Sequence, residues 1–368
     1  LIQELFKGRE RGRAFGMLGA TIGISTAVGP IVGGTIISAL GADAGWRWIF
    51  FVNLPVAVVA VVLALRWLPV PRRAGTGRLD LDPVGVVLLG AAVLTLLLPL
   101  VEAGRGGGNG SGPSVPWWVA LIGAALAVGF ITWERAYTRR GRSPLVDLEL
   151  FRVPGYSPGA AVGLIYFGGF TGIFFVLTLY FQESLGFTPL LAGLAVTPFA
   201  AGSAVAAALG GYLVNRYGRL LVTLGLMTVL VGLIAVDLVL AHVDGSALGW
   251  ALAAPLLVAG IGSGFVISPN VTLTLADVPV ERAGTAGGLL QTGQRIGTAA
   301  GIALIGAVYF AVASGQDGAR GAVWSLRVAA ALVAVALAAS AVDLRARRGS
   351  DQAAREGEVE EVDEVAGA

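Results

Sequence analysis

The sequence has no cysteine, a single histidine (His242) and few charged residues, which make up 13% of its 368 positions. The missing cysteines exclude a disulfide scaffold, thiolate metal sites and a thiol nucleophile. One histidine cannot form a two-histidine metal site, and the apolar segments contain no paired carboxylates, so we expect neither an enzyme active site nor a cofactor. Soluble domains average about a quarter charged residues, so this composition argues against an ordinary soluble domain. We likewise expect no nucleic-acid partner.

Apolar residues dominate instead: 56% of the sequence is hydrophobic and the mean hydropathy is +0.80. A helix needs about 20 apolar residues to cross the hydrocarbon core of a bilayer. The segments that meet or approach this length run from Ala14 to Leu40, Trp48 to Leu65, Pro83 to Val101, Trp117 to Trp133, Ala160 to Phe181, Pro189 to Leu213, Leu220 to Ala241, Leu248 to Leu275, Gly287 to Ala313, and Ala322 to Val342. We therefore predict an all-α, polytopic membrane protein with about ten transmembrane helices.

Basic residues are distributed asymmetrically around these segments. With the N-terminal end inside and the sides alternating, twenty of the 25 Lys and Arg residues fall in inner loops or at the chain ends, and only Arg47, Arg105 and Arg320 fall in outer loops. Since positively charged loops stay in the cytoplasm, both ends are predicted to be cytoplasmic and the protein to lie in the plasma membrane. The tail, residues 343–368, turns from basic to acidic and is predicted to be disordered.

The first segment carries helix-breaking residues at its middle, in "GISTAVGPIVGGTI" from Gly23 to Ile36. Ser25, Gly29 and Gly33 recur every four residues and form a small-residue stripe on which another helix could pack closely. Pro30 removes a backbone donor, and irregular backbone is tolerated in a membrane only against protein or a water-filled cavity. Spacing alone leaves open whether the stripe is simply a tight helix contact.

Polar residues within the ninth and seventh segments are candidates for a translocation path. A charge inside a span costs roughly 2.5 to 3.5 kcal/mol, and Arg295 lies about 12 Å deep at the usual helical rise. Gln291 and Gln294 complete a polar patch around it. The alternative is that Arg295 bonds to a neighbouring helix. Asp237 lies near the outer end of its segment, where a solvated acid is favoured over a path residue.

Two further segments carry residues suited to a substrate path. In the fifth, Phe170 and Phe174 recur at helical spacing near Thr171 and Thr178. They would suit a greasy cavity for aromatic or amphipathic compounds, although packing or lipid contact is the more common use of such a stripe. In the eighth, Asn270 follows a kinking proline and is a candidate lining residue.

The small-residue segment resembles a known signature. "GPIVGG", with a glycine upstream, is similar to the antiporter signature of the major facilitator superfamily, although a serine replaces one glycine of the pattern. The matching positions are Gly16, Ser25, Gly29, Pro30, Gly33 and Gly34. The segments "WRWIFFVNLPV", "SPLVDLELFRVPGY" and "ERAGTAGGLLQTGQRIGTAAG" are also similar to the fourteen-spanner drug:proton antiporters of the EmrB/QacA type. Together these four matches span most of the chain.

The loop between the sixth and seventh segments, "GGYLVNRYGRL", resembles the gating loop of the superfamily, G-x-L-x-D-R-x-G-R. The matching positions are Gly211, Leu213, Arg216, Gly218 and Arg219, with Asn215 in place of the acid. The resemblance implies that the acid helps to lock inward-facing helix ends. Asparagine can cap a helix but carries no charge, so any charge latch is weakened. The alternative is a basic turn that holds the topology.

The resemblance also implies an organisation and an activity. If the signature marks the fifth helix of the family, the chain supplies helices five to fourteen of a fourteen-helix fold. Residues 1–68 would then end the N-terminal bundle, 69–153 would hold two linker spans, and 154–342 would form a C-terminal six-helix bundle. The implied activity is proton-coupled efflux of small hydrophobic or amphipathic compounds, with the coupling carboxylate in the absent helices. The alternative is a non-transporting fragment that packs with other membrane chains.

Overall fold

The computed structural model describes residues 6, 9–67, 82–105, 115–142, 144–243, 245–313 and 317–366. Within these ranges the chain is helical and contains no strand. Among the described residues, ten stretches are long and apolar enough to cross a membrane, from Gly12–Leu40 to Gly318–Arg347. The prediction of an all-α, polytopic membrane fold is confirmed.

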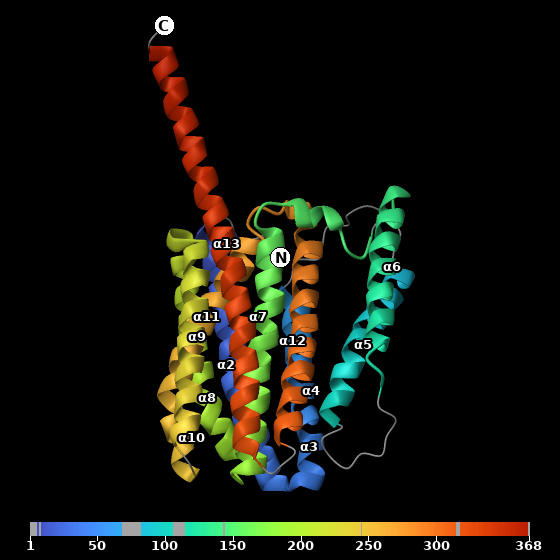
Figure 1. The fold of residues 1–368 in the computed structure, drawn as a ribbon, viewed down its shortest axis with the longest axis vertical. Helices are drawn as coiled ribbons and strands as arrows, with labels where there is room; N and C mark the ends of the chain where they lie inside the picture. The colour runs from blue at the N-terminus through green and yellow to red at the C-terminus, as the bar shows by residue number, and fades with distance from the viewer. Residues whose placement is uncertain are drawn as a thin grey trace.

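The long helices run side by side along one axis (Figure 1). They are α2 (Arg9–Leu40), α4 (Asn53–Trp67), α5 (Pro83–Arg105), α6 (Val119–Arg139), α7 (Tyr156–Leu179), α8 (Pro189–Tyr217), α9 (Arg219–His242), α11 (Ala253–Thr274), α12 (Ala283–Ala313) and α13 (Gly318–Ala366). The short elements are α3 (Ala42–Phe51), α10 (Leu248–Ala251), the 3-10 helices η1 (Leu148–Arg152), η3 (Gly245–Ala247) and η4 (Val280–Arg282), and the π-helix η2 (Tyr180–Ser184).

Proline breaks the second predicted span into α3 and α4. Pro55 lies in the first turn of α4, where a missing backbone donor costs nothing, but its ring would clash with the carbonyl of Phe51 in a continuous helix. Helix α3 therefore ends at Phe51. The side-chain amide of Asn53 donates to the carbonyl of Ile49 over 3.1 Å and so bridges the break.

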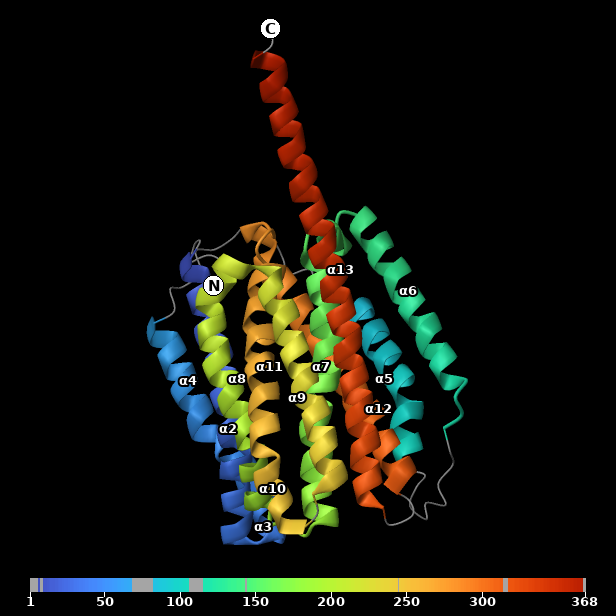
Figure 2. The same cartoon turned by 60° about the vertical axis from the view of Figure 1, so that its left-hand side comes forward.

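Helices α7 to α13 pack around one hydrophobic core, to which all of them except the four-residue α10 contribute two or more buried residues. Helix α8 lies against α2 and α11, while α7 lies against α12 and α13. The α5–α6 pair stands to one side and reaches the bundle through α12. Figure 2 shows α4 at one edge of the molecule and α6 at the other. Helix α4 has no buried residue, so its apolar side chains are open on every side.

Helix α13 continues beyond the bundle as far as Ala366 (Figure 1). The tail that composition predicts to be disordered is therefore helical as far as the structure describes it. Alanine, glutamate and arginine are the commonest residues from 343 onward, and all three have high helix propensity. A composition that cannot build a core can still extend a helix that starts in one.

Candidate translocation site

Helix α2 meets α8 along a seam of glycines. A side-chain carbon added at Gly23 would lie 2.6 Å from the Cα of Ala204, and one at Gly16 would lie 2.9 Å from the Cα of Gly211. The seam consists of Gly12, Gly16, Gly19, Gly23 and Gly34, and Gly193 of α8 faces Pro30 in the same way. Only glycine permits such close backbone approach, so this seam fixes how α2 docks on the bundle.

The predicted small-residue stripe lies on a different face of α2. A side-chain carbon added at Gly29 would have no neighbouring atom within 4 Å, and one added at Gly33 would have only the side chain of Ile49, at 3.8 Å. Ser25 is exposed. Two residues along a helix turn by about 200°, so Ser25 points away from the seam that contains Gly23. Of the signature positions, Gly16, Pro30 and Gly34 are at the seam, and the stripe itself is open in the described structure.

Arg219 is buried where four helices meet at one end of the bundle. Its guanidinium donates to the carbonyl of Gly155 over 2.6 Å and to Oδ1 of Asn270 over 2.9 Å. Its Nε lies 3.2 Å from Oδ2 of Asp343 on α13, and the two side chains are only 5% and 9% exposed. Asn270 in turn donates to the carbonyl of Gly159 over 2.9 Å. These contacts join α7, α9, α11 and α13.

This Arg219 network involves two residues that the sequence singled out. Asn270 is 2% exposed and both ends of its amide are engaged, so its place on a translocation path stays a prediction. Asn215 carries no charge, and Arg219 of the gating loop pairs with Asp343. Asp343 lies more than a hundred residues away in sequence, so the loop motif alone could not reveal it.

The rest of the gating loop lies between α8 and α2. Gly218 makes the turn from α8 to α9 with φ +51°, a conformation that glycine adopts at little cost. Asn215 and Arg216 line a cavity of about 350 Å³ together with Arg13 and Tyr212. The loop therefore touches α2 through neutral and basic groups, and its charge pairing runs to α13.

A second cavity, of about 430 Å³, lies along the far half of α7. It is lined by Thr171, Phe174, Phe175, Thr178, Leu179, Gln182 and Glu183. The π-helix η2 closes this stretch with hydrogen bonds from the amide of Leu185 to the carbonyl of Tyr180 (3.2 Å) and from Phe187 to Phe181 (2.8 Å). A π-turn shifts the register of a helix and is frequent at functional sites; here Gln182 and Glu183 line the cavity.

Glu183 is an acid of this cavity that the sequence analysis did not identify. The fifth span is predicted to end at Phe181, which places the following "QES" outside the membrane. The signal available was an acid within one turn of an aromatic-rich span. The structure continues the helical path through Ser184 and so brings this carboxylate to a cavity with two threonines.

The predicted phenylalanine stripe forms an aromatic cluster beside this cavity. The ring of Phe199 on α8 lies 5.0 Å from that of Phe174 and 5.8 Å from that of Phe170, between ring centres. Phe170 and Phe174 are partly buried, while Phe199 is 1% exposed. Phe174 therefore serves both packing and cavity lining, whereas Phe170 packs against Tyr166, Phe167 and Phe199.

Arg295 lies on the face of α12 that reaches the cavity at Thr298. The hydroxyls of Thr298 and Thr171 are 3.3 Å apart, and Thr171 lines the cavity. Gln291, Arg295 and Thr298 are spaced by four and three residues, so they share one helix face. Gln291 and Arg295 are exposed, while Gln294 is 7% exposed and turns toward Gly163 of α7. The predicted polar patch is thus divided between two faces.

Asp237 is not part of this arrangement. It pairs with Arg327 of α13, whose Nε lies 3.2 Å from Oδ1 of the carboxylate. The two side chains are 23% and 49% exposed, so the pair lies on the outer surface of the bundle. A solvated acid is the favoured interpretation of Asp237 from the sequence; its pairing with Arg327, across ninety positions, is new information from the structure.

Comparison with known proteins gives the family. The model described as Major Facilitator Superfamily matches residues 1–302 and 160–361. The chain belongs to the major facilitator superfamily. A probable actinorhodin transporter of Streptomyces coelicolor is 35% identical over 338 residues, or 90% of this chain and 57% of the relative.

Two other facilitator relatives carry resistance names. The multidrug resistance protein Stp of Mycobacterium tuberculosis is 32% identical over 303 residues, which cover 82% of this chain and 53% of Stp. The puromycin resistance protein pur8 of Streptomyces alboniger is 34% identical over 316 residues, which cover 84% of this chain and 59% of pur8. The chain thus spans little more than half the length of these relatives.

Proposed function

We propose that this facilitator is a proton-coupled exporter of hydrophobic or amphipathic compounds, of the fourteen-helix drug:proton antiporter type. Its ten spans take the place of helices five to fourteen, with residues 1–68, 69–153 and 154–342 as the end of one bundle, the linker pair and the second bundle. Both described ends face the cytoplasm in this proposal. The resistance names of the relatives and the signature on α2 support the export direction.

The observation that carries this proposal is the cavity on α7. Its wall combines the rings of Phe174 and Phe175, two threonine hydroxyls and the Glu183 carboxylate. Ligand sites are typically apolar clefts with a few placed polar groups, and a volume of about 430 Å³ is within their usual range. An aromatic compound would stack on the rings, while a proton or a cationic group would compete for the carboxylate.

In this proposal the two opposite ends of the bundle open in turn, so that the substrate site is accessible from one side of the membrane at a time. The Arg219 network joins four helices at the end where the gating loop lies, and the cavity lies along the other half of α7. Protonation of Glu183 would release a cationic substrate on the outer side. Breaking of the Arg219 network would then let the gating-loop end open, while the rigid glycine seam carries α2 with α8.

Flux in proteoliposomes tests this function. The full-length gene product should move a lipophilic cationic dye against its gradient when a proton gradient is imposed. Glu183→Gln should abolish proton-driven movement, because the amide cannot exchange a proton, whereas Glu281→Gln, an exposed acid at the gating-loop end, should leave it unchanged. Absence of pH-dependent flux in the unaltered protein would refute the proposal. Normal flux in Glu183→Gln would remove Glu183 from the coupling step.

A further inference from the structure

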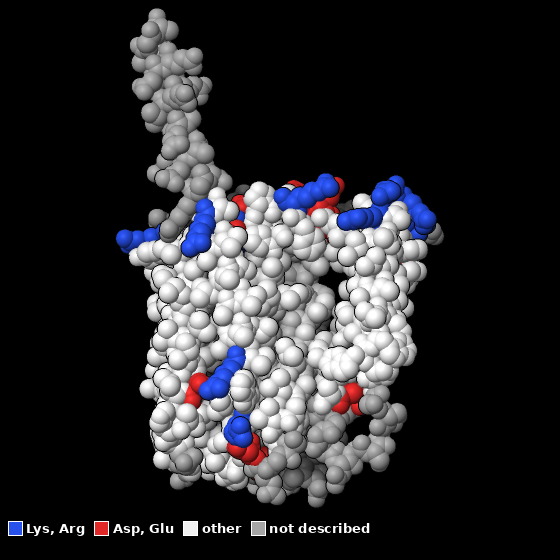
Figure 3. Space-filling view, in the orientation of Figure 1, with Lys and Arg blue, Asp and Glu red and all other residues white. Residues whose placement is uncertain are grey.

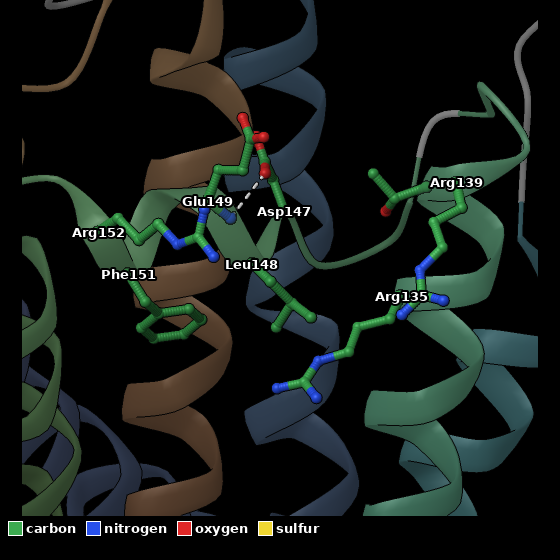
Figure 4. A pocket seen from close by; sticks show the side chains of 8 residues that line it. Arg135, Arg139, Asp147, Leu148, Glu149, Phe151 and Arg152 are labelled. Atoms are coloured by element: carbon green, nitrogen blue, oxygen red, sulfur yellow. Dashed lines mark hydrogen bonds between the residues drawn. The ribbon is translucent and has the colours of Figure 1, made fainter.

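A separate cavity of about 700 Å³ lies between the end of α6 and η1 (Figure 4). Arg135 and Arg139 reach it from α6, and Arg152 reaches it from η1. The remaining lining residues are Thr138, Asp147, Leu148, Glu149 and Phe151. The transport proposal makes no use of this cavity, which lies beyond the start of α7 and shares no residue with the cavity along the far half of α7.

The acids of this cavity are already paired. Nη1 of Arg282, the last residue of η4, lies 3.3 Å from Oδ2 of Asp147 and 2.9 Å from Oε2 of Glu149. Asp147 also accepts a hydrogen bond from the amide of Glu149, which shapes the first turn of η1. Among the described residues, no carboxylate lies within ion-pair distance of the three lining arginines. The cavity therefore presents three guanidinium groups, while the two carboxylates that also line it, those of Asp147 and Glu149, are paired with Arg282.

The surroundings of the cavity are those of a lipid headgroup site. Lys and Arg side chains gather at this end of the bundle (Figure 3). Below them, Figure 3 shows a hollow between the α5–α6 pair and the other helices. Helix α6 exposes Leu121, Val128 and Ile131, and Phe151 is 41% exposed at the cavity itself. A charged site thus stands directly above an apolar surface.

We propose that this cavity binds the phosphate headgroup of an anionic phospholipid of the inner leaflet, with its acyl chains along the apolar surface of α6. Guanidinium groups bind phosphate oxygens in a bidentate manner, and arginines from two elements can hold one phosphate between them. Basic pockets on the cytoplasmic side of membrane proteins bind anionic headgroups for this reason. A zwitterionic lipid has an ammonium group as well, which would find both nearby acids occupied by Arg282. The leaflet rests on the orientation proposed above; the site itself does not.

Native mass spectrometry of the full-length gene product tests this site without any transport readout. Dioleoyl phosphatidylglycerol should bind more tightly than dioleoyl phosphatidylcholine. The double variant Arg135→Gln/Arg139→Gln should weaken phosphatidylglycerol binding about 25-fold, at roughly fivefold per arginine for a contribution of about 1 kcal/mol each. Arg140→Gln removes one such charge directly after the end of the same helix, at a residue that does not line the cavity, and should leave the affinity within about twofold.

Three results would overturn the proposal. Equal affinity for the two lipids would show that the cavity does not distinguish an anionic from a zwitterionic headgroup. Equal losses of affinity per removed charge in Arg140→Gln and the double variant would show a diffuse surface effect rather than this cavity. Displacement of phosphatidylglycerol by millimolar inorganic phosphate would make the site one for a free anion. If dye flux fails but the lipid preference and its loss in the double variant hold, the lipid site stands without the transport function.

Discussion

Arg219 illustrates how a single buried charge depends on partners from distant parts of the chain. The desolvation of a guanidinium is costly, and only a complete set of partners offsets it. Here the set consists of the backbone carbonyl of Gly155 at the start of α7, the side-chain amide oxygen of Asn270 on α11 and the carboxylate of Asp343 on α13. Asp343 also pairs with Arg347 over 3.3 Å, one turn further along its own helix. The gating-loop end of the bundle is therefore tied by charge, not only by apolar packing.

Removal of this guanidinium should destabilise the protein strongly. Arg219→Ala leaves Oδ1 of Asn270 and the carbonyl of Gly155 without their donor and removes one of the two arginine partners of Asp343. Breaking a buried pair in this way costs about 3 to 5 kcal/mol. Thermal unfolding in detergent should show a lowered midpoint. Arg216→Ala, an exposed arginine of the same loop, should cost less than about 1 kcal/mol. Equal midpoints for the two variants would show that the network contributes little to stability.

Arg295 should matter for transport and not for folding. Its exposed side chain shares a helix face with Thr298 beside the α7 cavity, so its loss removes a charge from the proposed path without disturbing the core. Arg295→Ala is expected to abolish dye flux while leaving the amount of protein in the membrane unchanged. Arg327→Ala, which removes an arginine from the outer surface, is the matched control. Normal flux in Arg295→Ala would assign Arg295 to packing.

Individual polar residues were only partly predictable from the sequence. Charge within an apolar segment identifies Arg295 and Asp237 as unusual, because burial in lipid is costly for either sign. Their partners depend on which helices are neighbours and at what depth, and no local pattern encodes that. Asn270 illustrates this: its partner Arg219 comes from another helix, which no pattern around Asn270 indicates.

At the scale of elements, small residues set where helices meet. The α2–α8 seam recurs at intervals of three and four residues, which keeps it on one face of a helix with 3.6 residues per turn. A strict interval of four, as in Ser25, Gly29 and Gly33, is just as compatible with a packing face. The sequence therefore predicts that α2 has a face on which another helix packs closely. Which of the two candidate faces is used depends on where the neighbouring helix lies.

A pair of alanine substitutions separates the two faces. Gly23→Ala places a methyl group against the backbone of Ala204, and overpacking of this kind costs about 1 to 3 kcal/mol. Gly29→Ala meets open space and should stabilise the helix by up to about 1 kcal/mol, because alanine is the better helix former. In detergent, the thermal unfolding midpoint should fall for Gly23→Ala and rise for Gly29→Ala. A destabilised Gly29→Ala would mean that another helix covers this stripe.

For the whole molecule, apolar length predicts the architecture well. The ten spans among the described residues are found because each needs only about 20 apolar residues, a property of composition alone. Backbone geometry adds what composition does not predict, namely the break between α3 and α4 ahead of Pro55 and the π-turn that extends the helical path after α7. Helix neighbours, cavities and ion pairs depend on how distant segments pack together, and local sequence patterns do not predict that packing.

Orientation can be read with single cysteines, since the chain has none of its own. Ala276 follows α11 at the gating-loop end, and Ala247 precedes it at the opposite end; both are exposed. In intact cells a membrane-impermeant maleimide should label Ala247→Cys and spare Ala276→Cys, because the basic end is expected inside. The reverse labelling would invert the proposed topology and with it the leaflet of the lipid site.

The most direct test of the central claim is the movement of protons driven by substrate. In proteoliposomes of the full-length gene product with no initial pH difference, an imposed gradient of the lipophilic cationic dye should drive protons in the opposite direction, recorded with an internal pH indicator. Glu183→Gln should remove the proton signal. Dye movement without any proton counterflow in the unaltered protein would contradict the account of a proton-coupled exporter.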